Sequence, residues 1–260
     1  MKKYIRIYKE CVKISFAQAA TYRLNFILDI SILLISNLLF PLVTILIYRS
    51  GSSYPGWNFY EVLLIQSIFI ISTGFADMLF NGILWATMDH IVNGTFELVL
   101  IKPVDCTFLL LASNFQINSI ALVIGGLTLS IIAIIHLGGL TLIGLLCALL
   151  FFLGGLSVML GFAFMMAATS FKWVANSRIP EMFHSVQQFG NYPQSIFPKV
   201  VVGVITFIIP VSMIGFFPSS ALLGTINGYM FLALIPCIFF AILGIGLFKH
   251  MVHLYEGVGG

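Results

Sequence analysis

Residues 141–169 read TLIGLLCALLFFLGGLSVMLGFAFMMAAT, and this stretch contains no Asp, Glu, Lys or Arg. A helix rises about 1.5 Å per residue, so about 20 apolar residues span the hydrocarbon core of a bilayer. A helix that faces lipid needs no polar face, because lipid tails solvate its apolar side chains. The stretch therefore predicts a membrane-spanning α-helix.

The rest of the chain has the same character. Of its 260 residues, 60% are hydrophobic and only 8% are charged. Soluble domains contain about 25% charged residues, because their cores need a polar cover. We therefore expect an all-α membrane protein. Six apolar runs are long enough to be transmembrane helices, and they lie at 25–48, 59–80, 108–135, 141–169, 200–217 and 229–249.

The amino-terminal residues 1–22 read MKKYIRIYKECVKISFAQAATY and are too polar to span. On a helical wheel, one side carries Ile5, Tyr8, Val12, Phe16 and Ala19, and an adjacent sector carries Lys2, Arg6, Lys9 and Lys13. This pattern is typical of a basic amphipathic helix lying in the membrane interface, close to anionic lipid headgroups. We assign 1–22 to that helix, 23–250 to the transmembrane domain and 251–260 to a tail.

The distribution of Lys and Arg predicts the orientation, since cytoplasmic loops are enriched in these residues. With the amino terminus in the cytoplasm, the outer loops hold only Arg49, and the side of Lys199 is open. The cytoplasmic parts then hold Lys2, Lys3, Arg6, Lys9, Lys13, Arg23, Lys102, Lys172, Arg178 and Lys249. We expect a multi-pass protein of a bacterial plasma membrane, with both termini and the tail in the cytoplasm.

Residues 171–199 are too polar for a helix that faces lipid. His184, Gln187, Gln188 and Asn191 are spaced to form one stripe of a helix, with apolar side chains opposite. A helix with one polar face can cross a membrane where that face lines a wet path or a partner helix. The alternative is an amphipathic helix on the cytoplasmic surface. If the segment crosses, the region before the last span dips in from outside and returns.

Sequence motifs for catalysis and cofactors are missing. The chain has no GxxxxGK[ST], GxGxxG or HExxH motif, so we expect no ATP site, no metal site and no catalytic residue in this chain. The four cysteines are far apart. His250, His253 and Glu256 have a spacing that permits a weak metal site, but a solvated helix end accounts for them. Asp29 and Asp77 lie near the cytoplasmic ends of their spans, where capping or interface pairing accounts for them.

Residues 81–107 form the first cytoplasmic loop after the amino-terminal helix, and they contain a predicted helix, an Asn93-Gly94 turn and a Pro103 stop. Residues 96–100, Phe-Glu-Leu-Val-Leu, are a short amphipathic piece whose apolar side chains need a cover. They can pack on the chain's own spans, or they can dock a soluble partner, since exposed apolar patches usually mark interaction sites.

The chain resembles the permease subunits of type 2 ABC exporters, in the branch of small six-helix subunits. The resemblance rests on the basic amino-terminal helix, on VNGTFELVLIKPVD, SFKWV and NYPQSIFP, and on FIIPVSMIGFFPSSALLG with Pro210, Pro218 and Gly224. It implies six helices with a re-entrant region before the last one. It also implies a dimer of permeases, formed with a second copy or a paralogue, and two cytoplasmic ATPase subunits that bind the ATP.

In such permeases the amino-terminal helix and the first cytoplasmic loop contact the ATPase, which by match are residues 3–20 and 83–103. The coupling candidates are Phe96, Glu97, Leu98, Lys102, Lys9 and Lys13, and the candidates for the translocation path are His184, Gln187, Gln188 and Asn191. We therefore predict the permease subunit of an ATP-driven exporter, with membrane lipid and no nucleic acid among its partners. The alternatives are a self-contained channel or carrier, or an intramembrane enzyme that pairs Asp29 with Asp77.

Overall fold

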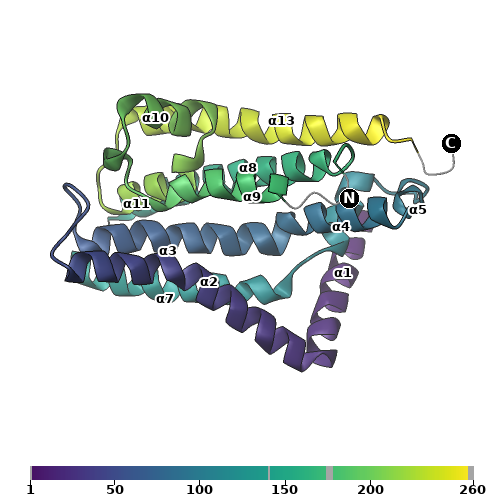
Figure 1. Cartoon of the computed structure of the whole chain (residues 1–260), viewed down its shortest axis with the longest axis horizontal. Helices are drawn as coiled ribbons and strands as arrows, with labels where there is room; N and C mark the ends of the chain where they lie inside the picture. Colours follow the sequence, from purple (N-terminus) through teal and green to yellow (C-terminus); the bar gives the residue numbers. More distant parts are fainter. Residues whose placement is uncertain (1, 140, 174–177, 257–260) are drawn as a thin grey trace.

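The computed structural model describes residues 2–139, 141–173 and 178–256, and in these ranges the chain is helical and forms no strand. Within them, five helices are long and apolar enough to cross a membrane. Their bounds are Arg23–Arg49 (α2), Phe59–Val92 (α3, η1 and α4), Ile117–Leu137 (η2 and α7), Leu142–Thr169 (α8) and Gly228–His253 (α12 and α13). They lie side by side as a bundle (Figure 1), which confirms an all-α membrane protein.

Two close helix pairs form the centre of the bundle, α3 (Phe59–Ala76) with α7 (Ile120–Leu137) and α8 with α13 (Leu234–His253). Small residues allow the close approach, as is common between membrane helices. A Cβ atom added at Gly244 of α13 would lie 2.4 Å from the carbonyl oxygen of Gly161 on α8. A Cβ atom at Gly126 of α7 would lie 2.9 Å from the carbonyl oxygen of Ser67 on α3.

The second span is longer than the sequence predicts. A π-helical turn, η1 (Asp77–Asn81), joins α3 to α4 (Gly82–Val92), so the helix continues from Phe59 to Val92. The first part of the expected loop at 81–107 is therefore an extension of a span. The connection that remains holds α5 (Phe96–Leu100) and ends at α6 (Cys106–Ser113).

The prediction of one span at 108–135 is wrong. α6 ends at Ser113, and the next span begins at η2 (Ile117–Ser119) and continues into α7. The chain breaks here because residues 114–116 pack against the second span. The backbone of Gln116 donates a hydrogen bond of 3.2 Å to the carbonyl oxygen of Met78. A Cβ atom added at Gly82 would lie only 2.2 Å from the carbonyl oxygen of Asn114.

The prediction of a continuous span at 200–217 is also wrong. α10 (Lys199–Gly203) and η5 (Val204–Ile208) form an apolar helix that is too short to span. Pro210, which has no N–H to continue the helix, follows. The chain then passes through η6 (Val211–Met213) into α11 (Phe216–Leu222), which packs on α8.

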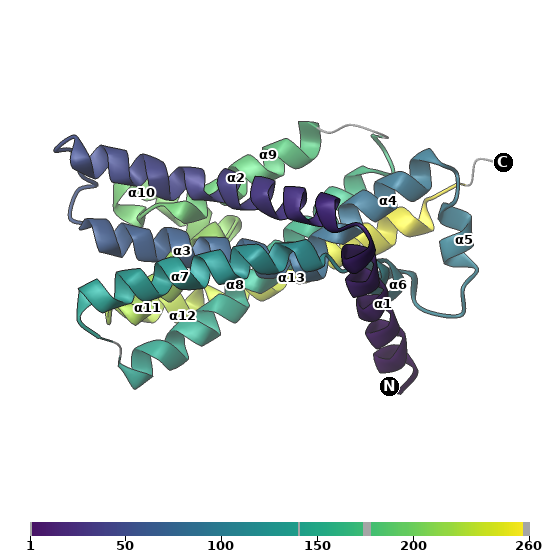
Figure 2. The same cartoon turned by 90° about the horizontal axis from the view of Figure 1, so that it is seen from below.

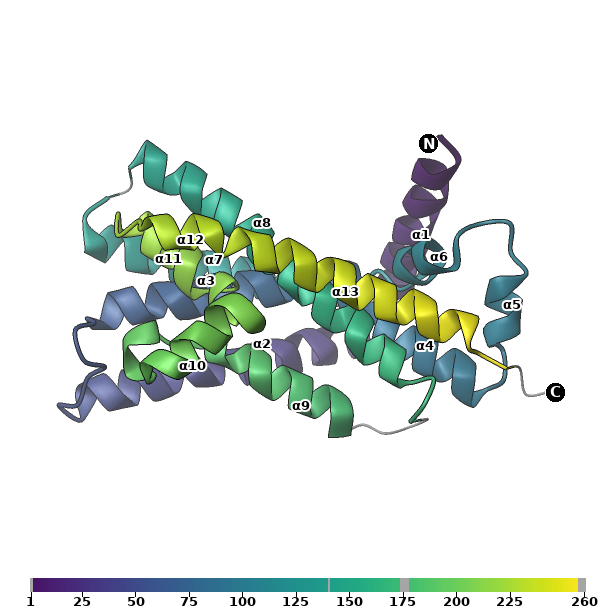
Figure 3. The ribbon, with the colours of Figure 1, turned by 90° about the horizontal axis from the view of Figure 1, so that it is seen from above.

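The course of the chain between α8 and α12 (Gly228–Leu232) connects the two ends of the bundle. α8 ends near α4, whereas α11 and the beginning of α13 lie at the opposite end, beside α10 (Figures 1 and 3). Short segments cover this distance, among them α9 (Arg178–Gln187), η3 (Gln188–Asn191) and η4 (Gln194–Ile196). Six crossings and a re-entrant course stay predictions, and residues 174–177 of the expected polar segment lie outside the described residues.

α1 (Lys2–Thr21) lies across one end of the bundle, at a steep angle to the long helices (Figures 1 and 2). The described part of the carboxyl terminus ends on the same side, next to α5. The helix forms as predicted, and its place in a membrane interface stays a prediction. Residues 257–260 of the expected tail lie outside the described residues.

Candidate functional site

The two elements expected to contact an ATPase lie together at this end of the bundle. Lys3 Nζ on α1 donates a hydrogen bond of 2.9 Å to the carbonyl oxygen of Pro103. Next to it, the ring of Tyr4 stands edge-on to the ring of Phe108, with centroids 4.8 Å apart. One end of α1 therefore packs on α6 and on the loop before it, so α1 and the 93–105 connection form one surface.

The other end of α1 is also held in place. Ser15 Oγ donates a hydrogen bond of 2.8 Å to the carbonyl oxygen of Phe115, in the break between α6 and η2. A cavity of about 580 Å³ lies beyond this contact, where α1 turns into α2. Asp29 lines it and accepts a hydrogen bond of 2.9 Å from Asn118 Nδ2.

The turn between α4 and α5 has the form that the sequence predicts for Asn93-Gly94. Gly94 has a φ of +64°, a conformation that suits glycine because it has no Cβ atom. Asn93 Nδ2 donates to Asp89 Oδ1 at 2.9 Å, and the ring of His90 lies 2.8 Å from Thr95 Oγ1. These contacts fix the direction in which α5 leaves the bundle.

Of the two interpretations of Phe96, the structure supports packing on the chain's own helices. Its side chain is fully buried, and its ring packs edge-on against the rings of Phe171 and Tyr255, with both centroid distances at 5.1 Å. Phe96 and Val99 fasten α5 to α8 and to the end of α13, because both face inward at a spacing of three residues. Phe96 itself is therefore unavailable to a partner protein.

The opposite face of α5 is exposed and apolar. Leu98 is 57% exposed and Ile101 is 76% exposed, and Leu100 is exposed as well. We call these three residues the end patch. Leu100 belongs to the predicted amphipathic piece, but neither Leu100 nor Ile101 was among the coupling candidates. The signal was the spacing of three residues between Phe96 and Val99. On a short helix, this spacing places Leu98 and Ile101 together on the other side.

Charged residues lie beside the end patch and on α1. Glu97 and Lys102 are exposed beside the patch, and Lys9 and Lys13 are exposed on α1. Lys13 Nζ lies 2.9 Å from Glu10 Oε1 in an exposed ion pair. Exposed pairs contribute only about 0–1 kcal/mol, so they leave these charges available to a partner.

The proposed polar stripe does not lie on one continuous α-helix. α9 ends at Gln187, and a 3-10 turn carries Gln188 and Asn191, which hydrogen-bond to each other. Gln187 and Asn191 are buried, whereas His184 is exposed. Gly190 lies in this 3-10 turn, where an added Cβ atom would be 2.8 Å from the carbonyl oxygen of Val211 and 3.2 Å from the ring of Phe69 on α3.

Buried polar contacts that the sequence analysis missed join α3 to its neighbours. Gln66 Nε2 donates to Thr44 Oγ1 of α2 at 2.7 Å, and Ser130 Oγ of α7 donates to Ser67 Oγ at 2.8 Å. Ser72 Oγ donates to the carbonyl oxygen of Ile214 at 2.8 Å. Hydrogen bonds of this kind hold membrane helices together, because a buried polar group without a partner is costly.

Some buried polar atoms have no partner among the described residues. They are Gln66 Oε1, Thr73 Oγ1, Asn81 Oδ1 and Gln187 Nε2, together with atoms of Thr87, Ser119, Ser220 and Tyr255. Gln66 and Thr73 of α3 and Asp77 of η1 are spaced by seven and four residues, so they share one face of the second span. This face is a further candidate for a polar path, and the spacing was visible in the sequence.

Neither an acidic pair nor a metal centre is found in the part of the chain that the structure describes. Asp77 accepts a hydrogen bond from Asn81 and Asp29 from Asn118, so each carboxylate has its own amide partner. Within residues 2–139, 141–173 and 178–256, no group of three or more His, Cys, Asp or Glu side chains is placed to hold a metal ion. The described cysteines Cys11, Cys106, Cys147 and Cys237 are free thiols.

A comparison with curated proteins finds no match, and a comparison with solved structures finds none either. A scan against protein families gives a match to the family described as ABC-2 family transporter protein, over residues 32–259. The match covers the helical bundle from within α2 to beyond α13. The chain therefore belongs to the ABC-2 family of transporter proteins and is a membrane permease of an ABC transporter.

Proposed function

We propose that this permease is the membrane subunit of an ATP-driven exporter, and that a separate cytoplasmic ATPase docks on α1, the end patch and the 93–105 connection. The observation that carries the proposal is the contact of Lys3 and Tyr4 with Pro103 and Phe108. Lys3 and Pro103 are 100 residues apart in the sequence, and their contact joins α1 and the 93–105 connection into one surface. A movement of the 93–105 connection can therefore reach α1 through Pro103 and α6.

The proposed surface combines an apolar centre with a charged rim. Leu98, Leu100 and Ile101 supply exposed apolar area, and Glu97 and Lys102 flank it. In protein interfaces, a few apolar anchors dominate the binding free energy, whereas charges at the rim mainly influence orientation and rate. Phe96 lies on the buried side of α5 and packs this helix against α8 and α13.

The complete transporter is proposed to contain two permeases and two ATPase subunits. The exposed side of α2 carries Ile27, Leu28, Ile32, Ile35, Leu39 and Leu46, which suit either lipid or a second permease. The route for the substrate is proposed to run between the two permeases, along the polar face of the second span and past His184, Gln187, Gln188 and Asn191. The partner ATPase binds the ATP, and this end of the bundle faces the cytoplasm.

The test of this function is a comparison of ATP hydrolysis by the permease alone and by its complex. The chain is tagged in its own host, solubilised in a mild detergent and purified, and a co-purifying protein with a P-loop is identified by mass spectrometry. We expect the complex to hydrolyse ATP and to lose this activity when the Lys of the partner's P-loop is changed to Ala. The permease alone should show no turnover, because its sequence has no phosphate-binding loop. Turnover by the isolated chain would contradict the proposal.

A further inference from the structure

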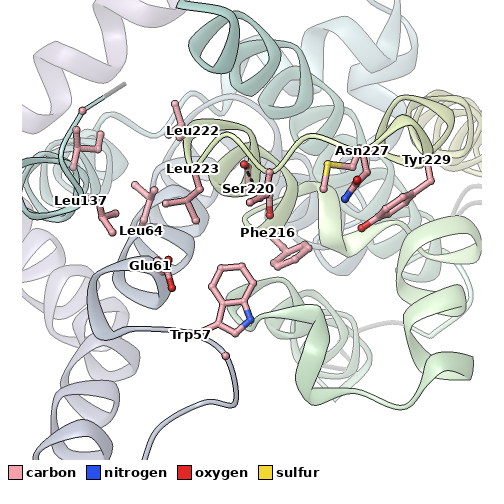
Figure 4. Close-up of a pocket in the computed structure, with 15 residues that line it drawn as sticks. Trp57, Glu61, Leu64, Leu137, Phe216, Ser220, Leu222, Leu223, Asn227 and Tyr229 are labelled. Carbon is pink, nitrogen blue, oxygen red and sulfur yellow. Dashed lines mark hydrogen bonds between the residues drawn. The ribbon is translucent and has the colours of Figure 1, made fainter. Parts of the chain in front are cut away.

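A second cavity lies at the opposite end of the bundle, where the 50–58 turn meets α11 and α12. Its volume is about 480 Å³, within the range of about 300–1,000 Å³ that small-molecule sites occupy. Figure 4 shows it between the carboxylate of Glu61, the indole of Trp57 and the ring of Phe216, with Ser220, Asn227 and Tyr229 further along. The proposed ATPase surface makes no use of this site.

A hydrogen bond and ring contacts position the aromatic side chains that line the cavity. Trp57 Nε1 donates a hydrogen bond of 2.9 Å to Ser195 Oγ. The centroids of the Trp57 and Phe216 rings are 5.6 Å apart. Phe217, behind Phe216, packs edge-on against Tyr229 with centroids 5.8 Å apart. Faces of aromatic rings attract organic cations, and a tryptophan face does so most strongly.

Glu61 supplies a negative charge on the same cavity. Its Oε2 atom accepts a hydrogen bond of 2.8 Å from the backbone N–H of Asn58, in a capping box that begins α3. No Lys or Arg is found among the described residues that line the cavity, and none of them forms an ion pair with Glu61. Within residues 2–139, 141–173 and 178–256, the carboxylate therefore has no Lys or Arg as an ion-pair partner.

Ser220 adds an unused hydrogen-bonding group. Its side chain is 1% exposed, it lines the cavity, and its hydroxyl has no hydrogen-bond partner among the described residues. The Ser220 carbonyl is already occupied, because it accepts hydrogen bonds from the backbone and the hydroxyl of Thr225. A buried hydroxyl without a partner is costly, so a ligand that bonds to it gains affinity.

We propose that this cavity binds an organic ammonium ion, which the carboxylate of Glu61 and the rings of Trp57 and Phe216 hold while its polar substituent bonds to Ser220. The ion can be a free small molecule or the headgroup of a lipid, since both present the same chemistry. The proposal goes beyond the proposed export function. Its test needs no ATPase, so its failure would leave that function untouched.

The test uses choline as the probe and Trp57 as the reporter. Trp85 and Trp173 are about half exposed, so Trp85→Phe and Trp173→Phe leave Trp57 as the one tryptophan without disturbing the core. In a maltoside detergent, which has no ammonium group, choline should change the fluorescence saturably. Its uncharged isostere 3,3-dimethylbutan-1-ol should cause no saturable change. Absence of saturation with choline, or an equal response to the isostere, would overturn the proposal.

Glu61→Gln is the decisive variant, because a glutamine oxygen still accepts the Asn58 N–H bond while the charge is lost. We expect the dissociation constant for choline to rise about tenfold or more, with an unchanged melting temperature, whereas Glu97→Gln at the other end leaves it unchanged. Ser220→Ala gives a second readout, since it should weaken choline binding and leave tetramethylammonium, which has no hydroxyl, unaffected. Unchanged choline binding in Glu61→Gln would refute the site.

Nanodiscs distinguish the two sources of the ion. If a lipid headgroup occupies the cavity, free choline should bind more weakly in phosphatidylcholine nanodiscs than in nanodiscs of diglucosyldiacylglycerol, an uncharged lipid without an ammonium group, because the headgroup competes. If the site takes free molecules, the two dissociation constants should agree. Either result supports an ammonium site and assigns its source, whereas absence of saturable binding in both kinds of nanodisc refutes it.

Discussion

Lys3 Nζ lies 2.9 Å from the carbonyl oxygen of Pro103, and this hydrogen bond connects the beginning of the chain to the loop that leads into α6. The neighbouring ring contact of Tyr4 with Phe108 adds apolar area to the same junction. Together they fix α1 across the end of the bundle. The junction accounts for how two segments that look independent in the sequence can respond to one partner.

The ring contact of Tyr4 should hold α1 in place. An edge-to-face aromatic pair contributes about 0.5–1.5 kcal/mol beyond burial, so Tyr4→Ala should raise the population of detached α1 by up to about tenfold. Hydrogen exchange of residues 3–15 should then become faster. Tyr22→Ala is the matched control, because Tyr22 is 64% exposed. Equal exchange in Tyr4→Ala and in the unchanged protein would show that the ring contact does not hold the helix.

Phe96 and Leu98 should separate stability from docking. Phe96 is fully buried, and removal of a buried phenylalanine ring costs about 3–5 kcal/mol, so Phe96→Ala should lower the melting temperature clearly. Leu98→Ala should leave it nearly unchanged, since exposed positions contribute within about 0.5 kcal/mol. Thermal unfolding of both variants in detergent checks the difference. A similar loss in both would mean that α5 is not packed as described.

The close pair of α8 and α13 should depend on Gly244. Because an added Cβ atom would lie 2.4 Å from the Gly161 carbonyl oxygen, Gly244→Ala should force the helices apart and lower the melting temperature. Gly246→Ala is the control on the same helix, because nothing lies within 4 Å of its added Cβ atom. That variant should be neutral or slightly stabilising, since alanine favours a helix over glycine. Equal melting temperatures for both variants would contradict the packing.

The orientation is tested with introduced cysteines in a background without Cys11, Cys106, Cys147 and Cys237. Ser52 and Asn93 are both exposed, in the α2–α3 and α4–α5 connections. Figure 1 shows these two connections at opposite ends of the bundle. On intact cells, a thiol reagent that cannot cross the membrane should label Ser52→Cys and spare Asn93→Cys. Both should react in opened membranes. The reverse pattern on intact cells would place the ATPase surface outside and refute the proposed orientation.

Hydropathy and charge predict the membrane class, and they locate most long helices to within a few residues. They fail where backbone contacts decide the path. The run at 108–135 is apolar throughout much of its length, yet it breaks after Ser113 because Asn114 and Gln116 pack on the backbone of Gly82 and Met78. Similarly, Pro210 ends a helix in a stretch whose hydropathy alone suits a span.

In the candidate site as well, the features that depend on local sequence were predicted and those that depend on long-range contacts were not. The Asn93-Gly94 turn and the amphipathic piece after it were readable, because turn chemistry and short periodicity are local. The side of α5 that faces inward was not readable. It depends on Phe171 and Tyr255, which lie far from Phe96 in the sequence and close to it in space. The cavity lined by Glu61 and Ser220 was missed for the same reason, because these two residues come together only in the folded chain.

The most direct test of the ATPase surface is co-purification of the partner with variants of the end patch. Leu98→Ala with Ile101→Ala removes two exposed side chains without touching the core. Leu142→Ala with Ile143→Ala removes a pair of similar exposure, 73% and 70%, at the other end of the bundle and serves as the control. We predict at least a tenfold loss of co-purifying ATPase in the first pair, with unchanged insertion and melting temperature, and full recovery in the control. Full recovery of the ATPase by Leu98→Ala with Ile101→Ala would contradict the account.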